Sequence, residues 1–482
     1  MREITVTARY FFDVTDTKAY LKRHTTLSGI QRVSLEVIGE CVRQAGAGNV
    51  FLCLWDRRRK TYTAISSDFL KAGLDVDVLT AVLHGRSTQP AHAVSPMLKR
   101  YRNRPVKYHL YRALAHIQAL RGEESYFAKR GSSIAEWRKG LPAADDIKPT
   151  AYETHNVTDI IQAQDQLIVL GATWGLRGFD GYMQTLKDSH DVQISMQVHD
   201  LIPLVMPHHL VSEFSLEFHR WLETSTHYCS RYFVAAQNTA RDLERFMDEV
   251  GTRHPVTVIP FARRLGGDDA APLPRTLKEQ CTAVKDIPQA IRNKTKVPYV
   301  LVVGTLESRK NLWRLVQAWD RLTRLPDLDM PRLVFAGRQG WFNEELMDWM
   351  RASGNLRGWV QFVNGPSDEE LAYLYRNCLF TATVSLYEGW GLPIGESLGF
   401  GKTAVVADNS AMPEVGGDLV AYCDATSITS IAEACLRLIA DPDHRRALEE
   451  RIAQADLRGW DDVAADYIAA LLPSDSSATP PA

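Results

Sequence analysis

Short apolar segments alternate with amphipathic segments along most of the chain, and this alternation restricts the fold more than any other feature. Runs such as DQLIVLG, YVLVVG and TAVVAD are too short for buried helices, and residues with helical spacing follow most of these runs. Strands that alternate with helices in this way form parallel sheets with helices on both faces. Because 482 residues exceed what one core accommodates, we expect an α/β protein with two doubly wound domains.

A polar stretch separates two series of this alternation. Residues 264–297 are rich in Gly, Asp, Pro and Lys, and we interpret them as the link between domains. We place a first domain at 1–285, a second domain at 286–458 and a final helix at 459–472, long enough to cross back to the first domain. The tail, 473–482, is expected to be disordered.

Residues 86–150 interrupt the first series with a basic, aromatic insertion. From Lys99 to Lys139 there are eleven Lys and Arg residues against three Glu, and a helix is expected through YHLYRALAHIQAL. An anionic membrane surface attracts such a segment. A solvated helical excursion with its charges in water explains the same composition, so both interpretations stay open.

Cysteine usage and hydropathy indicate the compartment. The seven cysteines are scattered and form no C-x-x-C pair, which favours free thiols in a reducing environment over disulfides or a zinc site. We find neither an apolar run of membrane-spanning length nor an amino-terminal secretory signal. The expected location is the cytoplasm, with peripheral contact at the inner face of the plasma membrane through 99–139. The net charge of −2 gives no attraction to nucleic acid.

The segment EGWGLPIGE, Glu388 to Glu396, carries the clearest chemical signal. Pro393 suits the first turn of a helix, and Gly389 and Gly391 allow backbone amides to approach a ligand. The amino end of a helix binds anions, phosphate above all. Two acids beside such a site are suited to accept hydrogen bonds from sugar and ribose hydroxyls. The alternative is a strand–turn–helix junction with two surface acids.

Three further segments carry candidate site residues. In GTLESRKN, Gly304 ends a strand, and Arg309 and Lys310 at the following turn could reach a diphosphate. In HDLIP, His199 lies at the carboxyl end of a strand, where open α/β sheets bind ligands. In SGIQR, Gly29 could bring the backbone against a ligand. A basic surface pair, a structural histidine and an ordinary loop glycine are the respective alternatives.

Two other assignments concern local structure only. Thr239 is predicted to be the N-cap of the helix that follows the strand RYFVAA. Asp327-Leu-Asp329 has the D-x-D form of a metal site, but it lies in a predicted loop far from the other candidates, and we interpret it as turn chemistry.

Taken together, GTLESRKNL, the strand end FAG, VNGPSDEEL, EGWGLPIGE and MPEVG resemble the retaining glycosyltransferases of the GT-B fold, family 4. The resemblance covers 298–472. FDVTD, SGIQRV and HDLIP resemble a bacterial branch whose members use mannose or deoxymannose donors bound to GDP. The resemblance to the GT-B glycosyltransferases implies two Rossmann-like domains facing a cleft, with a nucleotide sugar on the second domain and a glycan or lipid-linked glycan acceptor on the first.

The resemblance also implies roles for individual residues. Glu388 would bind donor-sugar hydroxyls, Glu396 the ribose, and Arg309 and Lys310 the diphosphate. His199 would lie near the donor sugar. The remaining donor-binding residues would be Gly29, Gly304, Gly337, Arg338, Asn364, Pro366, Gly389, Trp390, Gly391 and Leu392. Trp390 stands where the family often has phenylalanine.

The expected function is therefore transfer of a hexose, with retention, in bacterial surface polysaccharide synthesis. GDP-mannose is the expected donor, and no cofactor or metal is expected because the cations and the helix dipole would stabilise the leaving diphosphate. Front-face attack is expected, with Glu388 as a covalent nucleophile the alternative. A UDP-hexose donor and a catalytically silent sugar-nucleotide-binding protein remain the alternatives for function. A dinucleotide oxidoreductase is disfavoured because no G-x-G-x-x-G follows the first strand.

Overall fold

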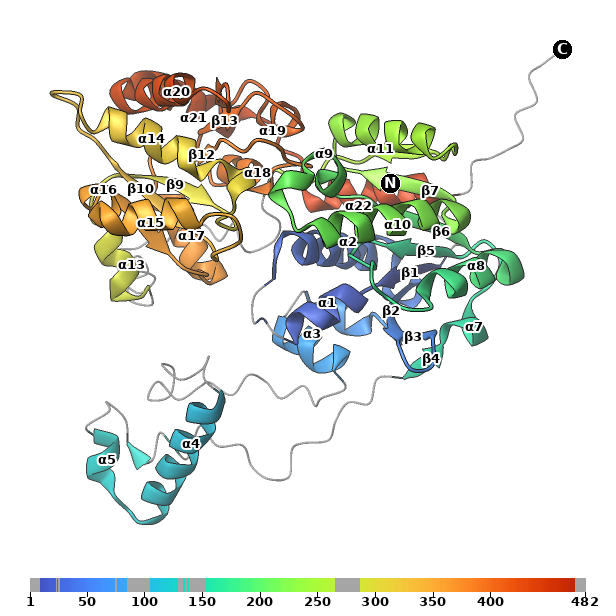
Figure 1. Ribbon diagram of the computed structural model, residues 1–482. Helices are drawn as coiled ribbons and strands as arrows, with labels where there is room; N and C mark the ends of the chain where they lie inside the picture. Colours follow the sequence, from blue (N-terminus) through green and yellow to red (C-terminus); the bar gives the residue numbers. More distant parts are fainter. Residues whose placement is uncertain are drawn as a thin grey trace. The chain divides into compact units, whose positions relative to one another are not determined.

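The computed structural model describes residues 9–22, 24, 27–73, 76–84, 105–128, 133, 134, 137, 153–264 and 287–472. These residues fall into two compact units (Figure 1). The larger unit comprises the described residues within 1–20, 26–72 and 154–482, and it holds both sheets. The smaller unit comprises those within 21–25 and 73–153.

The first sheet has eight strands in the order β4-β3-β2-β1-β5-β6-β7-β8. The strands span Tyr10–Asp13 (β1), Val50–Asp56 (β2), Thr61–Ser66 (β3), Thr154–Asn156 (β4), Gln166–Val169 (β5), Gln193–Gln197 (β6), Arg231–Val234 (β7) and Val256–Val258 (β8). From β2 to β8 all neighbouring strands are parallel, whereas β3 and β4 pair antiparallel at one edge. The strand order reverses at β1, which lies between β2 and β5.

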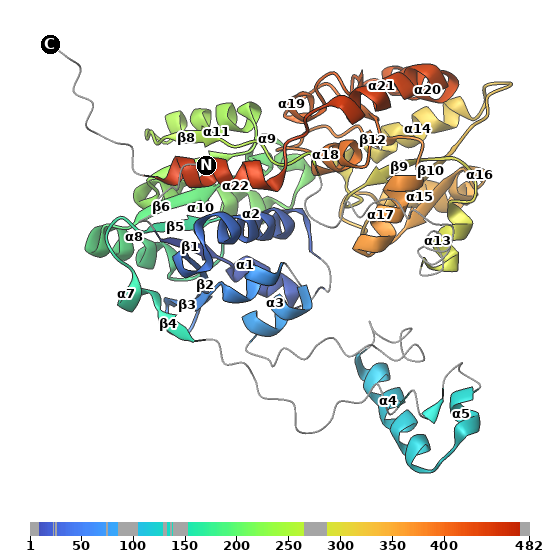
Figure 2. The ribbon, with the colours of Figure 1, turned by 180° about the vertical axis from the view of Figure 1, so that it is seen from behind.

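Helices cover both faces of this sheet. They span Thr15–Leu21 (α1), Gly29–Ala45 (α2), Val157–Ile160 (α7), Phe179–His190 (α8), Ile202–Val205 (α9), Ser212–Tyr228 (α10), Gln237–Glu249 (α11) and Trp460–Leu471 (α22). α8, α10 and α11 place their apolar side chains in one core with the strands. α22 packs along α2 (Figure 2), and the Tyr467 ring lies 4.9 Å from the Phe233 ring of β7. The final helix thus packs on the first sheet.

The second sheet has six parallel strands in the order β11-β10-β9-β12-β13-β14. The strands span Tyr299–Val303 (β9), Arg332–Ala336 (β10), Val360–Val363 (β11), Thr381–Thr383 (β12), Ala404–Ala407 (β13) and Ala421–Cys423 (β14). Every residue of β13 and four of the five in β9 are buried, as a parallel sheet covered on both faces requires.

The helices of the second domain form two apolar clusters with this sheet. They span Gln289–Lys294 (α13), Leu312–Leu322 (α14), Glu344–Ala352 (α15), Gly354–Arg357 (α16), Asp368–Asn377 (α17), Leu392–Gly399 (α18), Met412–Gly416 (α19), Ile428–Ala440 (α20) and Pro442–Gln454 (α21). α14 and α20 contribute to one cluster and α13 and α17 to the other. α17 begins with a capping box, in which Ser367 and Glu370 exchange hydrogen bonds between side chain and backbone.

The smaller unit contains α3 (Val76–Leu83), α4 (Pro105–Leu120) and α5 (Glu124–Ala128). Ala115 and Ala119 of α4 are buried against Phe127 and Trp137. The predicted helix through YHLYRALAHIQAL is therefore present as α4. Much of the predicted insertion, including 85–104 and 138–152, lies outside the described residues.

The predicted GT-B-type architecture of two doubly wound sheets is confirmed, with two differences. The first sheet is not wholly parallel, because the turn after β2 at Arg57–Lys60 returns the chain as β3 beside the strand it has just left. The interpretation of 264–297 as a link is wrong at its carboxyl end, since Ile287 and Ile291, the latter in α13, pack into the second core. Residues 265–286 and the tail 473–482 lie outside the described residues.

No helix in the described ranges combines the length and the apolar composition needed to cross a bilayer.

The packing of α22 on the first sheet gives a testable prediction. The Tyr467 hydroxyl donates to the Gln197 Oε1 atom, and both residues are buried. Tyr467→Phe leaves that buried acceptor without its donor, so we expect the free energy of unfolding in urea to fall by about 1–3 kcal/mol. The control is Tyr10→Phe, whose buried hydroxyl has no hydrogen-bond partner among the described residues, and it should change stability by no more than about 0.5 kcal/mol. Equal effects of the two changes would contradict the assignment.

Candidate active site

The candidate site lies where the strand order of the second sheet reverses. β9 and β12 are neighbours, but the chain leaves them toward opposite sides of the sheet, β10 lying beyond β9 and β13 beyond β12. Ligands bind to open α/β sheets in the crevice that such a reversal leaves at the carboxyl ends of the strands. Arg309 and Lys310 follow β9 in a short 3₁₀ helix, Ser308–Lys310, and Glu388 follows β12. The reversal therefore brings residues that are far apart in the sequence to one place.

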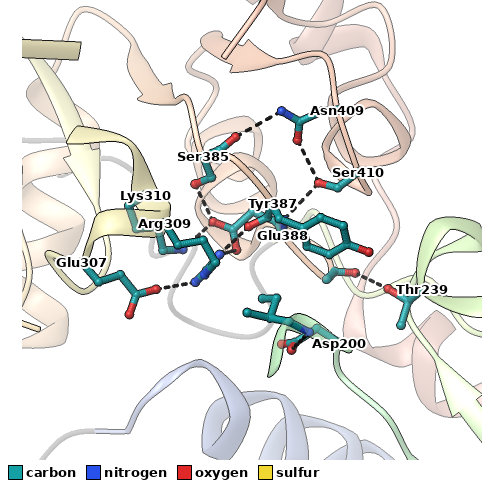
Figure 3. A network of polar contacts seen from close by, with 12 residues as sticks. Asp200, Thr239, Glu307, Arg309, Lys310, Ser385, Tyr387, Glu388, Asn409 and Ser410 are labelled. Atoms are coloured by element: carbon teal, nitrogen blue, oxygen red, sulfur yellow. Dashed lines mark hydrogen bonds and ion pairs between the residues drawn. The ribbon is translucent and has the colours of Figure 1, made fainter. Parts of the chain in front are cut away.

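The centre of the site is a cluster of three charged side chains, each no more than 16% exposed (Figure 3). The Lys310 Nζ atom lies 2.6 Å from Glu388 Oε1, and the Arg309 Nη1 atom lies 3.1 Å from Glu388 Oε2. The Ser385 hydroxyl donates to Glu388 Oε1 at 2.6 Å. Arg309 also pairs with Glu307 and donates to the Tyr387 carbonyl. Both carboxylate oxygens of Glu388 are thus held by donors.

Burial and charge act in opposite directions on this carboxylate. Burial alone would raise the pKa of Glu388, but Arg309 and Lys310 favour the ionised form more strongly and lower its pKa to about 2. Glu388 and Glu307 in turn raise the pKa of the Arg309 guanidinium, against the effect of its burial. At neutral pH Glu388 is ionised, so it accepts hydrogen bonds and cannot donate a proton.

Neighbouring polar groups fix the loops that carry the cluster. The buried Asn311 side chain donates to the carbonyls of Val384 at 2.9 Å and Ala425 at 2.7 Å, which ties the turn after β9 to the ends of β12 and β14. Asn311 adopts φ 59°, a conformation that asparagine tolerates. The Glu388 amide donates to the Ser410 hydroxyl at 3.0 Å. These contacts set the position of the three charged groups.

The first domain meets this cluster through the segment after β6. A Cβ atom on Gly389 would lie 2.2 Å from the His199 carbonyl oxygen and 2.6 Å from the Asp200 Cβ atom, so only glycine fits there. The His199 Nε2 atom lies 2.7 Å from the Leu170 carbonyl, and burial lowers the pKa of His199. Burial raises the pKa of Asp200, while the nearby Arg309 acts in the opposite direction. The His199 backbone is therefore next to Gly389, the residue that follows Glu388.

Helix α18 begins directly after the Glu388 segment. Gly391 precedes it with φ 98°, a left-handed conformation that favours glycine, and Pro393 lies in its first turn. Gly29, the first residue of α2, packs against the start of α18, since a Cβ atom there would lie 3.1 Å from Leu392 Cδ1. One turn inside α18, Glu396 accepts a hydrogen bond of 2.6 Å from the Tyr375 hydroxyl.

The remaining predicted donor-binding residues lie at the ends of β9, β10 and β11. A Cβ atom on Gly337 would lie 1.8 Å from the Gly304 carbonyl oxygen, so these two strand ends approach closely. The Gly365 amide, between Asn364 and Pro366, donates to the Gly337 carbonyl at 3.2 Å. Arg338 donates to the Tyr20 hydroxyl at 3.1 Å. These residues are adjacent to one another, as a shared binding role requires.

Trp390 is buried with its ring 6.0 Å from that of Phe261, and its indole N–H has no hydrogen-bond partner among the described residues.

A cavity of about 680 Å³ lies in the first domain between the loop after β5 and α10. Its lining includes Trp174, Arg177, Asp180, Glu217, Arg220 and Trp221. The cavity is separate from the Glu388 cluster.

Across the described ranges, no group of three or more His, Cys, Asp and Glu side chains is arranged to hold a metal ion. Asp327 has φ 56° in the loop between α14 and β10, as its interpretation as a turn residue implies.

Sequence reasoning missed several residues of the site. Asp200 and Tyr387 adjoin His199 and Glu388 in the chain, and Glu307 lies in the segment GTLESRKN, so adjacency was an available signal for these three, whereas Ser385 offered none. The prediction of Thr239 as N-cap is wrong. The cap position is Ala236, and Thr239 is the third helical residue, where its hydroxyl donates to the Gly389 carbonyl at 3.1 Å. A contact with a distant loop, not local capping, accounts for this residue.

The fold and the position of the cluster define a GT-B architecture. A solved structure, Anabaena Alr3699/HepE in complex with UDP and glucose, matches 96% of this chain and 99% of that chain, with a TM-score of 0.52 and 12% sequence identity. At that identity the likeness establishes the fold alone. Residues 284–455, which hold the second sheet, match the family described as "Glycosyl transferases group 1".

Two curated relatives extend the comparison. "O-antigen chain mannosyltransferase B" of Escherichia coli is 32% identical over 164 residues, which cover 34% of this chain and 42% of that protein. "Serotype-specific mannosyltransferase WbdA" of Escherichia coli is 26% identical over 242 residues, which cover 49% of this chain and 28% of that protein. The chain therefore matches less than half the length of each of these two relatives.

The lowered pKa of Glu388 predicts a pH-dependent contribution to stability. Since the pKa falls from 4.5 to about 2 on folding, the ionised group stabilises the fold by about 3 kcal/mol above pH 4.5, and this contribution disappears as the pH falls toward 2. Glu388→Gln should therefore be less stable than the wild type at pH 7, and the difference should shrink between pH 4.5 and 2. Urea unfolding at several pH values measures it. A difference that is constant with pH would contradict the ion-pair account.

Proposed function

We propose that the chain transfers a hexose, mannose from GDP-mannose, to a glycan or lipid-linked glycan acceptor with retention of configuration. The observation that carries this proposal is the Arg309–Glu388–Lys310 cluster, which lies at the reversal point of the second sheet and beside the start of α18. The domain that holds the cluster matches the glycosyl transferases group 1 family.

The diphosphate of the donor would bind to Arg309, Lys310 and the amino end of α18. A helix amino end carries a partial positive charge that attracts phosphate. The Lys310 ammonium group has three N–H donors, and its bond to Glu388 uses one of them. We infer that these groups stabilise the leaving nucleoside diphosphate without a metal ion.

The two glutamates of the EGWGLPIGE segment would bind hydroxyl groups. Glu388 is ionised and acts as an acceptor toward the hexose hydroxyls, and Glu396 with Tyr375 would bind the ribose. Because Lys310, Ser385 and Arg309 already restrain its carboxylate, Glu388 is better suited to orient a sugar than to attack it. This favours front-face attack by the acceptor over a covalent intermediate on Glu388.

Mannose and polysaccharide synthesis are proposed from the two curated relatives, both of which are named mannosyltransferases. The donor base is proposed from the resemblance of FDVTD, SGIQRV and HDLIP to a GDP-using branch. We propose the cavity beside α10 as a place for the acceptor, because its lining combines indole rings with charged side chains that hydrogen-bond to hydroxyls. A UDP-hexose donor and a catalytically silent binding protein are the alternatives.

Nucleotide binding and transfer test this function together. GDP and GDP-mannose should raise the melting temperature of the wild-type protein, because a ligand of the native state stabilises it, and UDP compounds should not. Lys310→Ala should reduce mannose transfer to a lipid-linked glycan acceptor by more than tenfold, because it removes a charge-assisted contact with the diphosphate. Addition of EDTA should leave transfer unchanged.

The control is Lys296→Ala, an exposed lysine of the same domain, which should behave as the wild type. Stabilisation by UDP compounds alone would contradict GDP-mannose as the donor and favour a UDP-hexose. No response to any nucleotide sugar would remove the proposed function.

A peripheral membrane contact is a second part of the proposal, and it rests on α4 in the smaller unit. Opposite its buried alanines, α4 exposes four apolar side chains at helical spacing: Leu110 (64%), Leu114 (39%), Ile117 (44%) and Leu120 (72%). The surrounding sequence from Lys99 to Lys139 is strongly basic. An apolar stripe within a basic segment suits the surface of an anionic bilayer.

Vesicle sedimentation tests this contact. The full chain should bind vesicles that contain phosphatidylglycerol, and binding should fall as salt rises from about 0.1 to about 0.5 M because screening weakens the attraction. Leu110→Asp should weaken binding, whereas Leu325→Asp, at an exposed leucine of the second domain, should not. Equal binding to neutral phosphatidylcholine vesicles, or binding that is independent of salt, would exclude this contact.

A further inference from the structure

Helix α11 of the first domain has no side-chain cap of its own. Its N-cap is Ala236, which makes no capping hydrogen bond. Instead the carboxylate of Glu414, in α19 of the second domain, accepts from the amides of Gln237 at 2.7 Å and Asn238 at 2.9 Å. A carboxylate at a helix amino end satisfies unpaired amides and interacts well with the helix dipole. The second domain thus supplies the cap of a first-domain helix.

The first turns of α11 also hold the two residues that flank Glu388. The Tyr387 hydroxyl accepts from the Asn238 side chain at 2.6 Å and donates to the Asp242 carboxylate. On the other side of Glu388, the Thr239 hydroxyl donates to the Gly389 carbonyl at 3.1 Å (Figure 3). The Asp242 side chain is only 10% exposed, so its bond to Tyr387 is largely shielded from water.

The Glu388 segment is therefore held from both domains. Arg309 and Lys310 of the second domain hold its carboxylate, and Arg309 also donates to the Tyr387 carbonyl. α11 holds the tyrosine ring and the glycine carbonyl next to it. The contacts with the second domain hold the Glu388 carboxylate and the Tyr387 carbonyl, whereas the contacts with α11 hold the Tyr387 hydroxyl and the Gly389 carbonyl.

We propose that α11 is a positioning element for Glu388, with Asp242 acting through the Tyr387 hydroxyl and Thr239 through the Gly389 carbonyl. This inference rests on the proposed transfer function. According to this proposal, the first domain sets the position of Glu388, the carboxylate that would bind the donor sugar. Glu414 keeps α11 in place against the second domain. Small displacements of a positioning group lower turnover more than they lower ligand binding, because the reacting geometry is the more demanding one.

The bond between Asp242 and Tyr387 allows a double-mutant test. Tyr387→Phe keeps the ring and removes the hydroxyl, and Asp242→Asn keeps the shape and removes the charge. Each change should lower kcat for mannose transfer by about tenfold, the size expected for a hydrogen bond to a charged group. The Kd for GDP, which would bind to groups of the second domain, should change by less than about twofold. Because both changes break the same bond, the double variant should lose no more than about tenfold as well.

The control is Asp248→Asn, at the far end of α11, whose side chain is 59% exposed; its kcat should equal that of the wild type. A hundredfold loss in the double variant would show that the two residues act independently and would overturn the inference. A parallel loss of GDP affinity would show a merely structural role, and unchanged kcat in the single variants would show no role. Each of these outcomes overturns it.

A second measurement separates failure of the inference from failure of the proposed function. Hydrogen exchange of the backbone amides at 387–391 in the ligand-free protein needs no substrate. Exchange should be faster in Tyr387→Phe and Asp242→Asn than in the wild type and in Asp248→Asn. If the wild type transfers no hexose from any nucleotide sugar, the proposed function fails, while exchange still reports on α11. Unchanged exchange in both variants would overturn the inference even in an active protein.

Discussion

The site depends on one buried interaction, the ion pairing of Glu388 with Arg309 and Lys310. Burial of a carboxylate disfavours its charge, and the positive charges of Arg309 and Lys310 beside Glu388 reverse this effect and lower its pKa. The arrangement leaves a carboxylate that is ionised at neutral pH beside two cations and a helix amino end. Such a place suits a ligand that carries hydroxyl groups next to phosphates, which is the chemistry of a nucleotide sugar.

Sheet topology explains why these residues meet. The order of the second sheet reverses between β9 and β12, and the two turns that follow these strands carry the cations and the carboxylate. Asn311 then ties the turn after β9 to the ends of β12 and β14 through one backbone carbonyl of each. Close packing adds its own demands, since Gly337 and Gly389 lie where any Cβ atom would meet a carbonyl oxygen at 1.8 or 2.2 Å. The glycines of the motifs thus serve close approach of the backbone.

The first domain makes direct contacts with the segment that carries Glu388. It supplies His199 and Asp200 against Gly389, packs Gly29 near Leu392, and contacts Tyr387 and Gly389 through α11. Arg32 extends the same pattern, because its guanidinium pairs with Asp368 of α17 at 2.5 Å. Contacts of this kind make the geometry around Glu388 a joint property of two domains, although the match to the glycosyl transferases group 1 family covers only 284–455.

The sequence by itself determined the α/β class, the two series of strands and helices and the motifs that carry Glu388, Arg309, Lys310 and His199, because strand and helix periodicity and glycine-bearing turns are local properties. It did not reveal the antiparallel strands β3 and β4, the packing of α13 or the role of Thr239. Only the tertiary structure decided that Glu388 is neutralised by the cations expected to bind phosphate, and that Asp242 and Glu414 act across the domains. Those contacts join residues as far as 177 positions apart, and no local pattern records which distant side chain will satisfy a buried charge or an uncapped helix.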